Sequence, residues 1–491
     1  MPESSFPCTT RFSTMIGSPS QASLETSPCE HRQVTIDTLP DEVLVKIFFF
    51  YVNHRRIWTN GWHTLLHVCQ RWRHIALASP RRLNLRLEYT GRRPMSEIQD
   101  VWPVLPVVIS HHSSSYEFSN SYLDSCWGNV ASALESEHRH RICRIDLSLI
   151  PTSRWERLAA AMQNPFPELT SLRIWVAKNT VTSLPDSFLG GSAPLLRRLS
   201  LSNCPFPGIP KLLLSANQLL DLRLWNISDS GYISPQELVT ALSVMSRLKS
   251  LYLEFQSPLY PASRPPPPPT RSVLPALTQL TFKGVHDYLE DLLAQIEAPL
   301  LKNLDIVFFM DLHFVLPQLH QLISQAESFK SCNNAAVYIS DRAIQFAISR
   351  GTTWFPELSL RISCRELDLQ LASLGQVRSS TFPLLSNLVQ LDITDRVPRS
   401  HWNDDMETAQ WLELLDPFTA ITDLRLSDQS ARHVCQALEE LAEERVTEIL
   451  PALQNIFLKG LEPLESVPKY IGGFVAARKL SGHPVAIRYW E

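Results

Sequence analysis

A six-residue pattern recurs along most of this 491-residue chain and limits what the chain can fold into. Its form is apolar-x-x-apolar-x-apolar, and leucine fills most of the apolar positions. Copies occupy Ile142–Leu147, Leu169–Ile174, Leu196–Leu201, Leu219–Leu224, Leu248–Leu253, Leu277–Phe282, Leu301–Ile306, Leu388–Ile393, Ile421–Leu426 and Leu453–Leu458. One such unit cannot bury its own apolar side chains, so neighbouring units must stack and cover one another. The pattern predicts an α/β solenoid over residues 141–470.

The spacing of the copies resembles that of leucine-rich repeats. The central residues Leu172, Leu199, Leu222, Leu251 and Leu280 follow one another at 27, 23, 29 and 29 residues. Leucine-rich repeats have periods of about 20–29 residues, and each repeat supplies one strand and a returning helix. The resemblance implies an irregular leucine-rich-repeat solenoid, in which most copies lack the asparagine of the family pattern.

Local features fill in this prediction. Asn203 and Asn226 fit the asparagine that the repeat expects after its strand. Segments Pro235–Met245 and Ala431–Leu450 have the apolar spacing of helices between strands. The period falters between residues 307 and 386, where a motif at Phe355–Leu358 matches one at Phe166–Leu169 and predicts a distorted repeat.

Large side chains stand at positions of the repeat that should face outward. Side chains alternate along a strand, so the residue between the last two apolar positions, and the residue after them, point away from the core. Trp, Tyr and Arg are the residue types that dominate the energetics of protein interfaces. We therefore predict a substrate-binding patch; the alternative is that loops or the C-terminal segment cover it. Its residues are Arg173, Trp175, Arg223, Trp225 and Tyr252.

The N-terminal stretch Thr35–Pro80 has a different pattern. Leu39-Pro40-Asp41-Glu42 predicts a helix start, because proline fits the first helical turn and carboxylates suit its positive end. The following segment is apolar almost all round and therefore needs cover on more than one side. A second helical pattern follows Asn60-Gly61, in one or two short helices. So short a module buries little on its own.

This stretch resembles an F-box. The matching motifs are Leu39-Pro40, Asp41–Leu44, Ile47-Phe48 and Val68-Cys69-x-x-Trp72. The resemblance implies a three-helix module that binds the Skp adaptor of cullin–RING ubiquitin ligases, with apolar side chains inserted into that adaptor. By resemblance, the adaptor-binding residues are Leu39, Pro40, Leu44, Ile47, Phe48, Val68, Cys69 and Trp72. The long loop at 53–61 and Asn84 after Leu83 depart from the family pattern.

Composition and missing motifs narrow the function classes. A formal charge of -4 argues against a general nucleic-acid binder. The nine cysteines are scattered without a Cys-x-x-Cys pair, which favours a reducing, cytoplasmic or nuclear location and argues against a zinc site. No phosphate-binding glycine loop or nucleophile elbow occurs, so we expect no enzyme activity and no cofactor. His63 and His67 have metal-ligand spacing but no third ligand follows.

These observations predict an order of segments. Residues 1–33 form a disordered tail, 34–85 the F-box-like domain, 86–140 a connecting segment, 141–470 the repeats and 471–491 a C-terminal cap. The hypothesis is a substrate-recognition adaptor of a Skp–cullin–F-box ubiquitin ligase. The alternatives are a leucine-rich-repeat scaffold that assembles no ligase, and an enzyme with a dispersed site, which no residue spacing supports.

Overall fold

The computed structural model divides the chain into two compact units, Met1–Asn84 and Leu85–Glu491. It describes residues 36–54, 62–80, 82–99, 105–112, 120–177, 183–206, 208–258, 271–309, 314–351, 356–364, 367–379, 385–395, 408–441, 445–459 and 467–489. The predicted N-terminal tail lies outside these residues. Each unit is described by itself below.

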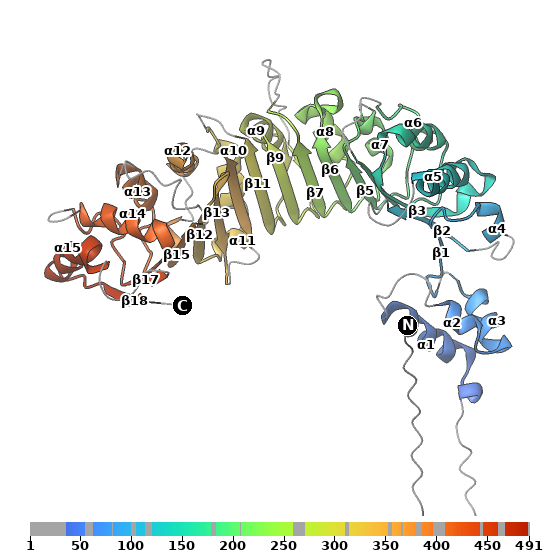
Figure 1. The fold of residues 1–491 in the computed structure, drawn as a ribbon, viewed down its shortest axis with the longest axis horizontal. Coiled ribbons are helices and arrows are strands. Elements are labelled where there is room, and N and C mark those ends of the chain that lie inside the picture. The colour runs from blue at the N-terminus through green and yellow to red at the C-terminus, as the bar shows by residue number, and fades with distance from the viewer. Residues whose placement is uncertain are drawn as a thin grey trace, which may run out of the picture. The chain divides into compact units, whose positions relative to one another are not determined.

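Within its described residues, the first unit has three α-helices. They are α1 (Asp41–His54), α2 (His63–Leu66) and α3 (Gln70–Ala78), preceded by the short η1 (Ile36–Thr38) (Figure 1). Helix α1 begins at the expected residue, because Pro40 offers its carbonyl to the amides of Val43 and Leu44. The second helical pattern is divided into α2 and α3, and both α1 and α2 pack against α3.

Ring packing and hydrogen bonds hold these helices together. Phe48 on α1 packs on Trp72 of α3, with ring centroids 4.8 Å apart. Arg71 binds the start of α1, donating to the carbonyl of Leu39 at 2.6 Å and to the carboxylate of Asp41 at 2.6 and 3.1 Å. Polar contacts at the start of α1 thus supplement a small apolar core.

One long sheet organises the second unit. Its order is β1-β2-β3-β4-β5-β6-β7-β9-β11-β14-β13-β12-β15-β16-β17-β18, and all pairings are parallel except those of β13. The strands are β1 (Leu87–Tyr89), β2 (Val107–His112), β3 (Ile142–Ile150), β4 (Ser171–Val176), β5 (Arg198–Ser202), β6 (Asp221–Ile227), β7 (Ser250–Phe255), β9 (Gln279–Gly284), β11 (Asn303–Phe309), β12 (Asn334–Ile339), β13 (Ala343–Ser349), β14 (Leu358–Ser363), β15 (Gln390–Asp395), β16 (Asp423–Ser427), β17 (Asn455–Lys459) and β18 (Ala486–Tyr489). A small second sheet pairs β8 (Ser272–Val273) with β10 (Ile296–Glu297).

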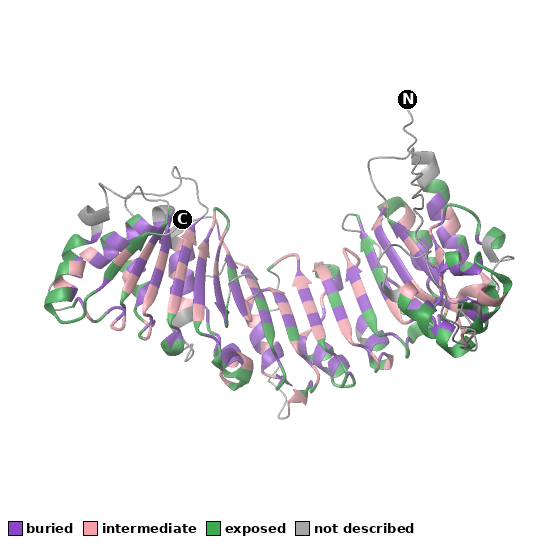
Figure 2. Cartoon of the chain, turned by 90° about the horizontal axis from the view of Figure 1, so that it is seen from below, coloured by how far each residue is buried: buried purple, intermediate pink, exposed green. Residues whose placement is uncertain are grey.

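Stacked rows of apolar residues form the core, as the six-residue pattern predicted. The parallel register places Leu172, Leu199, Leu222, Leu251 and Leu280 side by side on successive strands. Every apolar position of the ten copies is buried. Figure 2 shows the resulting alternation of buried and less buried residues along the strands. The leucine-rich-repeat-like α/β solenoid therefore follows from this chain's own register.

Helices pack along one face of the sheet and leave the other face open (Figure 1). They are α4 (Met95–Gln99), α5 (Asn120–Glu135), α6 (Thr152–Ala161), α7 (Ile209–Ser215), α8 (Pro235–Leu242), α9 (His286–Leu293), α10 (Pro317–Gln325), α11 (Glu327–Lys330), α12 (Leu367–Ser379), α13 (Thr408–Leu415), α14 (Asp428–Glu439) and α15 (Val467–Leu480). The helix expected at 235–245 begins at Pro235, after a capping box formed by Ser234 and Glu237, and ends at Leu242. The expected helix at 431–450 ends at Glu439, and turns follow.

The asparagines singled out in the sequence have a conformational role. Asn203, directly after β5, and Asn226, near the end of β6, both adopt positive φ, at 60° and 51°. Asparagine tolerates this left-handed region better than most side chains. The side-chain amide of Asn203 also donates to the carbonyl of Val176 at 2.8 Å, which links two successive repeats.

The sheet extends beyond the residues that carry the repeat pattern at both ends. Strands β1 and β2 belong to it, although we expected 86–140 only to connect the two units. These strands are short and lack the full six-residue pattern, so only their pairing reveals them. At the other end β18 pairs with β17, and the fully buried Arg478 of α15 donates to the carbonyls of Leu450, Pro451 and Leu453.

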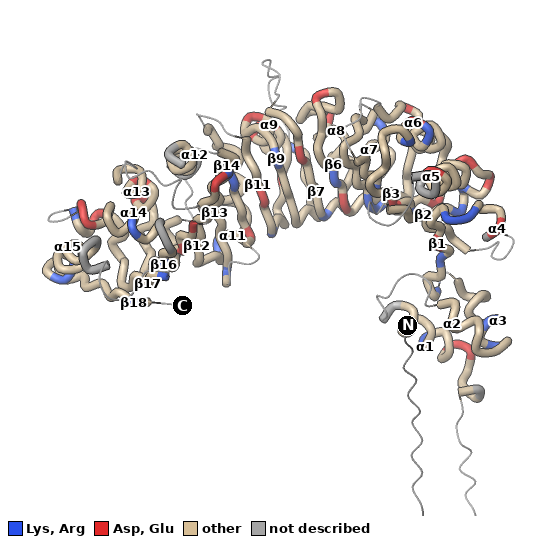
Figure 3. Tube along the Cα trace, in the orientation of Figure 1, with Lys and Arg blue, Asp and Glu red and all other residues tan. Residues whose placement is uncertain are grey.

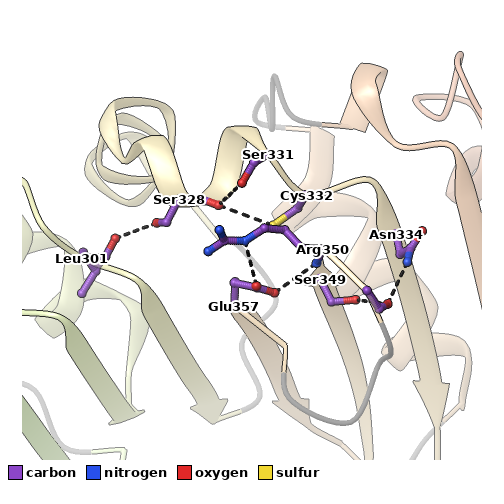
Figure 4. Close-up of polar contacts among 9 residues, drawn as sticks. Leu301, Ser328, Ser331, Cys332, Asn334, Ser349, Arg350 and Glu357 are labelled. Carbon is purple, nitrogen blue, oxygen red and sulfur yellow. Dashed lines mark hydrogen bonds and ion pairs between the residues drawn. The ribbon is translucent and has the colours of Figure 1, made fainter.

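The region where the period falters contains a reversal of the chain. After β11 the chain enters β12, turns back through β13 and reaches β14, which pairs in parallel with β11. Where β13 ends and β14 begins, an ion pair joins Arg350 Nε to Glu357 Oε1 at 3.0 Å, and Asn334 donates to the carbonyl of Gly351 (Figure 4). The expected distorted repeat is thus interrupted by the antiparallel strand β13. Phe355 of its motif lies outside the described residues.

Candidate functional sites

Burial divides the residues that the F-box resemblance assigned to adaptor binding. Leu44 and Phe48 have no exposed surface, and Phe48 contacts Trp72 of the same module. In this conformation they form the core of the first unit and are not available for insertion into a partner. The sequence could not separate them from their neighbours, because nearly the whole circumference of α1 is apolar.

The other side of α1 carries an exposed apolar row, here called the α1 stripe, made of Val43, Ile47 and Phe50. Their exposed fractions are 38%, 39% and 69%. At 100° per residue these three side chains point within about 60° of one another, and their mean direction lies roughly 90° from Leu44 and roughly 130° from Phe48. Burying a large apolar side chain contributes roughly 1.5–3 kcal/mol, so this stripe retains binding energy for a partner.

The α2–α3 turn adds two further exposed residues of the predicted set. Val68 is 57% exposed, and Cys69 is exposed as well. Cys69 has extended backbone geometry at the N-cap of α3, and its sulfur accepts a hydrogen bond from the amide of Trp72 at 3.5 Å. Cys69 therefore helps to begin α3 while Val68 remains open to solvent.

The remaining predicted residues have intermediate or mixed environments. Leu39 and Trp72 are half-buried, and Pro40 is exposed. Trp72 shields Phe48, and Leu39 is held by Arg71 through its carbonyl. These three residues thus lie between the core of the first unit and its surface.

The second candidate surface lies on the open face of β4, β6 and β7. We call it the Arg-Trp face; it consists of the predicted residues Arg173, Trp175, Arg223, Trp225 and Tyr252. Arg173, Trp175 and Arg223 are exposed, and Trp225 and Tyr252 are half-buried. Their burial agrees with the expected alternation along each strand, and in the described part of the chain no loop or C-terminal segment seals them.

Contacts fix part of this face. The rings of Trp225 and Tyr252 stack with centroids 3.7 Å apart at 28°. The Tyr252 hydroxyl donates to Glu254 Oε2 at 2.7 Å, and Lys283 donates to the other oxygen of Glu254 at 2.7 Å. Burial, followed by the hydrogen bond to Glu254, raises the pKa of Tyr252 well above its usual value, so the hydroxyl stays protonated.

Three residues of β5 that the hot-spot pattern did not predict also belong to this open face. Ser200 and Ser202 of β5 lie between the two Arg-x-Trp strands, and Arg198 precedes them on the same face. The signal was present, since the outward positions of Arg198–Ser202 follow the same alternation as those of its neighbours. Serine is not among the residue types that dominate interface energetics, so the hot-spot pattern did not predict Ser200 and Ser202.

Neither a metal site nor a membrane span emerges from the described residues. Among them, no three His, Cys, Asp or Glu side chains gather as a metal site would require, His63 and His67 included. Likewise, none of the helices within the described ranges combines the length and apolar character needed to cross a bilayer. Charged residues of both signs are interspersed along the second unit (Figure 3).

Comparisons with known proteins return little. No protein-family model matches the chain. No curated protein matches it either. One solved structure that it resembles is the leucine-rich repeat-containing protein LegL7 from Legionella pneumophila, at 16% identity and a TM-score of 0.26, over 81% of this chain and 98% of that one. The assignment of leucine-rich-repeat-like architecture here rests on the register of the sheet itself.

Proposed function

We propose that this protein is a substrate-recognition adaptor of a Skp–cullin–F-box ubiquitin ligase. The first unit docks the Skp adaptor, and the open face of the second unit holds a protein substrate. Other subunits of the ligase transfer ubiquitin, and this chain itself catalyses nothing. The assignment implies a reducing cytoplasmic or nuclear setting.

The exposed α1 stripe is the observation that supports docking best. Leu44 and Phe48 fasten α1 to its own module, while Val43, Ile47 and Phe50 stay accessible on the other side of the helix. A solvent-exposed row of large apolar side chains on a soluble protein is typical of a protein-binding site. Val68 and Cys69 are also exposed, and they belong to the second half of the F-box-like motif.

Leucine-rich-repeat-like architecture supports the second half of the proposal. Solenoids of this kind present extended surfaces to protein partners. The Arg-Trp face combines an exposed Trp175 with the stacked Trp225 and Tyr252, which are residue types that dominate interface energetics.

Co-purification with a Skp adaptor tests the docking claim. We expect the wild-type chain to retain the adaptor and the double variant Ile47→Glu, Val68→Glu to lose it, because two charges would face an apolar partner surface. Leu214→Glu is the matched control, since Leu214 is an exposed leucine (48%) on helix α7 of the second unit. Thermal unfolding of each variant checks that the fold is intact.

The docking claim is contradicted if the wild-type chain does not bind the adaptor. It is also contradicted if the double variant binds the adaptor as tightly as the wild type. Loss of binding by Leu214→Glu would instead indicate general misfolding.

A repeat scaffold that assembles no ligase is the alternative function. The contacts that support it are those of the second unit, whose Arg-Trp face lies on β4, β6 and β7 and is restrained by Glu254 of β7 and Lys283 of β9. A protein that captures a substrate through Trp175 but never binds a Skp adaptor would fit this alternative.

A further inference from the structure

On the Arg-Trp face the register sets short side chains of β5 between long side chains of β4 and β6, and this arrangement is called the groove below. Strands β4 and β6 both carry Arg-x-Trp, and the register aligns Arg173 and Arg223 across Ser200 of β5. Trp175 and Trp225 are aligned in the same way across Ser202. Between the two arginines and the two tryptophans, β5 thus carries only the short side chains of Ser200 and Ser202, with Arg198 at its start.

The width of this groove suits one inserted side chain. Two strand spacings separate β4 from β6, which is about 10 Å. Contacting aromatic rings lie about 4.5–7 Å apart, so the indoles of Trp175 and Trp225 leave room for a large apolar or aromatic side chain between them. Ser202 forms the floor because its side chain is too short to fill that space.

One wall of the groove is already fixed. Trp225 stacks on Tyr252, and the chain of contacts from Tyr252 through Glu254 to Lys283 restrains that ring. A ligand therefore meets a preorganised surface, and the side chains of this surface lose less conformational entropy when the ligand binds.

Positively charged side chains outnumber negatively charged ones around the groove. Arg223 is paired with Asp221, with its Nε 3.0 and 3.1 Å from the two carboxylate oxygens. On β3, Asp146 lies across from Arg173 in the register and pairs with Arg144. Asp221, which pairs with Arg223, lies across from Arg198. These two aspartates are outnumbered by the four arginines. Arg173 and Arg198 are exposed, and in the described part of the chain neither guanidinium has an ion pair with a carboxylate. Arg173 and Arg198, which form no ion pair among the described residues, add positive charge beside the two tryptophans, and this favours negative charge next to a large apolar side chain.

We infer that this groove binds an acidic segment of a protein substrate in which Asp or Glu flanks a large apolar residue. The apolar side chain inserts between Trp175 and Trp225, and the carboxylates pair with Arg173 and Arg198. This assignment rests on the proposed substrate-binding role of the open face and specifies the chemistry of the substrate.

A random peptide library displayed on phage and selected against the full-length chain tests the inference. We expect the enriched peptides to carry Asp or Glu beside Trp, Phe, Tyr or Leu. Fluorescein-labelled copies of the enriched peptides then measure affinity by anisotropy. The double variant Arg173→Glu, Arg198→Glu should lower the affinity at least about tenfold, and raised salt should weaken the wild-type interaction.

A steric variant and a matched control sharpen this experiment. Ser202→Trp fills the floor of the groove and should lower the affinity at least about tenfold while leaving the arginines in place. Arg361→Glu makes the same charge change on the open face at β14, where Arg361 is exposed and binds Gln345, and should leave the affinity unchanged. Thermal unfolding confirms that each variant is folded.

The inference is overturned if the enriched peptides are not acidic. It is also overturned if the selection enriches no peptide at all. It is also overturned if Arg361→Glu weakens binding as much as the Arg173→Glu, Arg198→Glu pair. The adaptor co-purification is a separate measurement, so a chain that binds a Skp adaptor but prefers neutral peptides refutes only this inference. A chain that prefers acidic peptides without binding an adaptor refutes only the ligase assignment.

Discussion

Helix α1 of the first unit and the strand ladder of the second unit are both rich in large apolar residues, yet they bury them differently. In the ladder, Leu222 is covered by Leu199 and Leu251 on its neighbouring strands. On α1, Phe48 is fully buried while Ile47 beside it stays 39% exposed. A repeat has a neighbour on each side, whereas three short helices have too few partners to surround one apolar helix. The exposed apolar side chains of α1 therefore indicate a binding surface, although the apolar composition of α1 alone does not distinguish it from the strand ladder.

The largest expected effect concerns the two adjacent residues of α1. Phe48→Ala should lower the stability of the first unit by about 3–5 kcal/mol, because a buried aromatic side chain leaves a cavity against Trp72. Ile47→Ala should leave stability within about 0.5 kcal/mol and weaken only adaptor binding. Hydrogen exchange of the α1–α3 amides in the full chain measures the stability of the first unit in both variants, and co-purification measures adaptor binding. Equal loss of protection in the two variants would mean that Ile47 belongs to the core.

The strand ladder gives the next effect. Leu222→Ala should destabilise the second unit by about 2–5 kcal/mol, since the cavity interrupts the row between Leu199 and Leu251. Denaturant unfolding measures this loss. Leu214→Ala, at an exposed position on α7, serves as the comparison and should change the midpoint very little. If the two leucines proved equivalent, the stacked core described above would be wrong.

A smaller effect is expected at Asn203, which links neighbouring repeats. Asn203→Ala should cost about 1–2 kcal/mol, because alanine is strained at φ 60° and loses the bond to Val176. Asn203→Gly loses the same bond without the strain and should fall between alanine and the wild type. Thermal unfolding ranks the three proteins, and a glycine variant less stable than alanine would contradict the role of backbone strain.

The smallest expected effect depends on pH and concerns His111 on β2. Burial, partly offset by its hydrogen bond to the Thr90 carbonyl, lowers the pKa of His111 below 6.5. As the pH falls through 6.5 the unfolded chain binds a proton that the folded chain does not, so the free energy of unfolding decreases. His111→Gln should flatten this part of the pH–stability curve, measured by denaturant unfolding between pH 7 and about 5. An unchanged slope would show that His111 does not contribute.

Local pattern was enough to predict much of the fold and part of the sites. The inward rows and the outward Arg173, Trp175 and Arg223 follow from the period of two residues along a strand. The helix start near Asp41 follows from Pro40 and the carboxylates after it. The adaptor set was predicted as one group, although Leu44 and Phe48 are core and Ile47 and Val68 are surface. Which side of an all-apolar helix is covered depends on residues distant in sequence, such as Trp72.

The sequence by itself determined that this chain builds a stack of leucine-bearing strands, because each copy repeats the same short-range spacing of apolar residues. Only the tertiary structure decided that β12–β14 reverse direction, that β1 and β2 extend the sheet, and that two Arg-x-Trp strands enclose Ser202. These features arise from hydrogen bonds and packing between strands far apart in the chain, and no local period encodes which strand pairs with which.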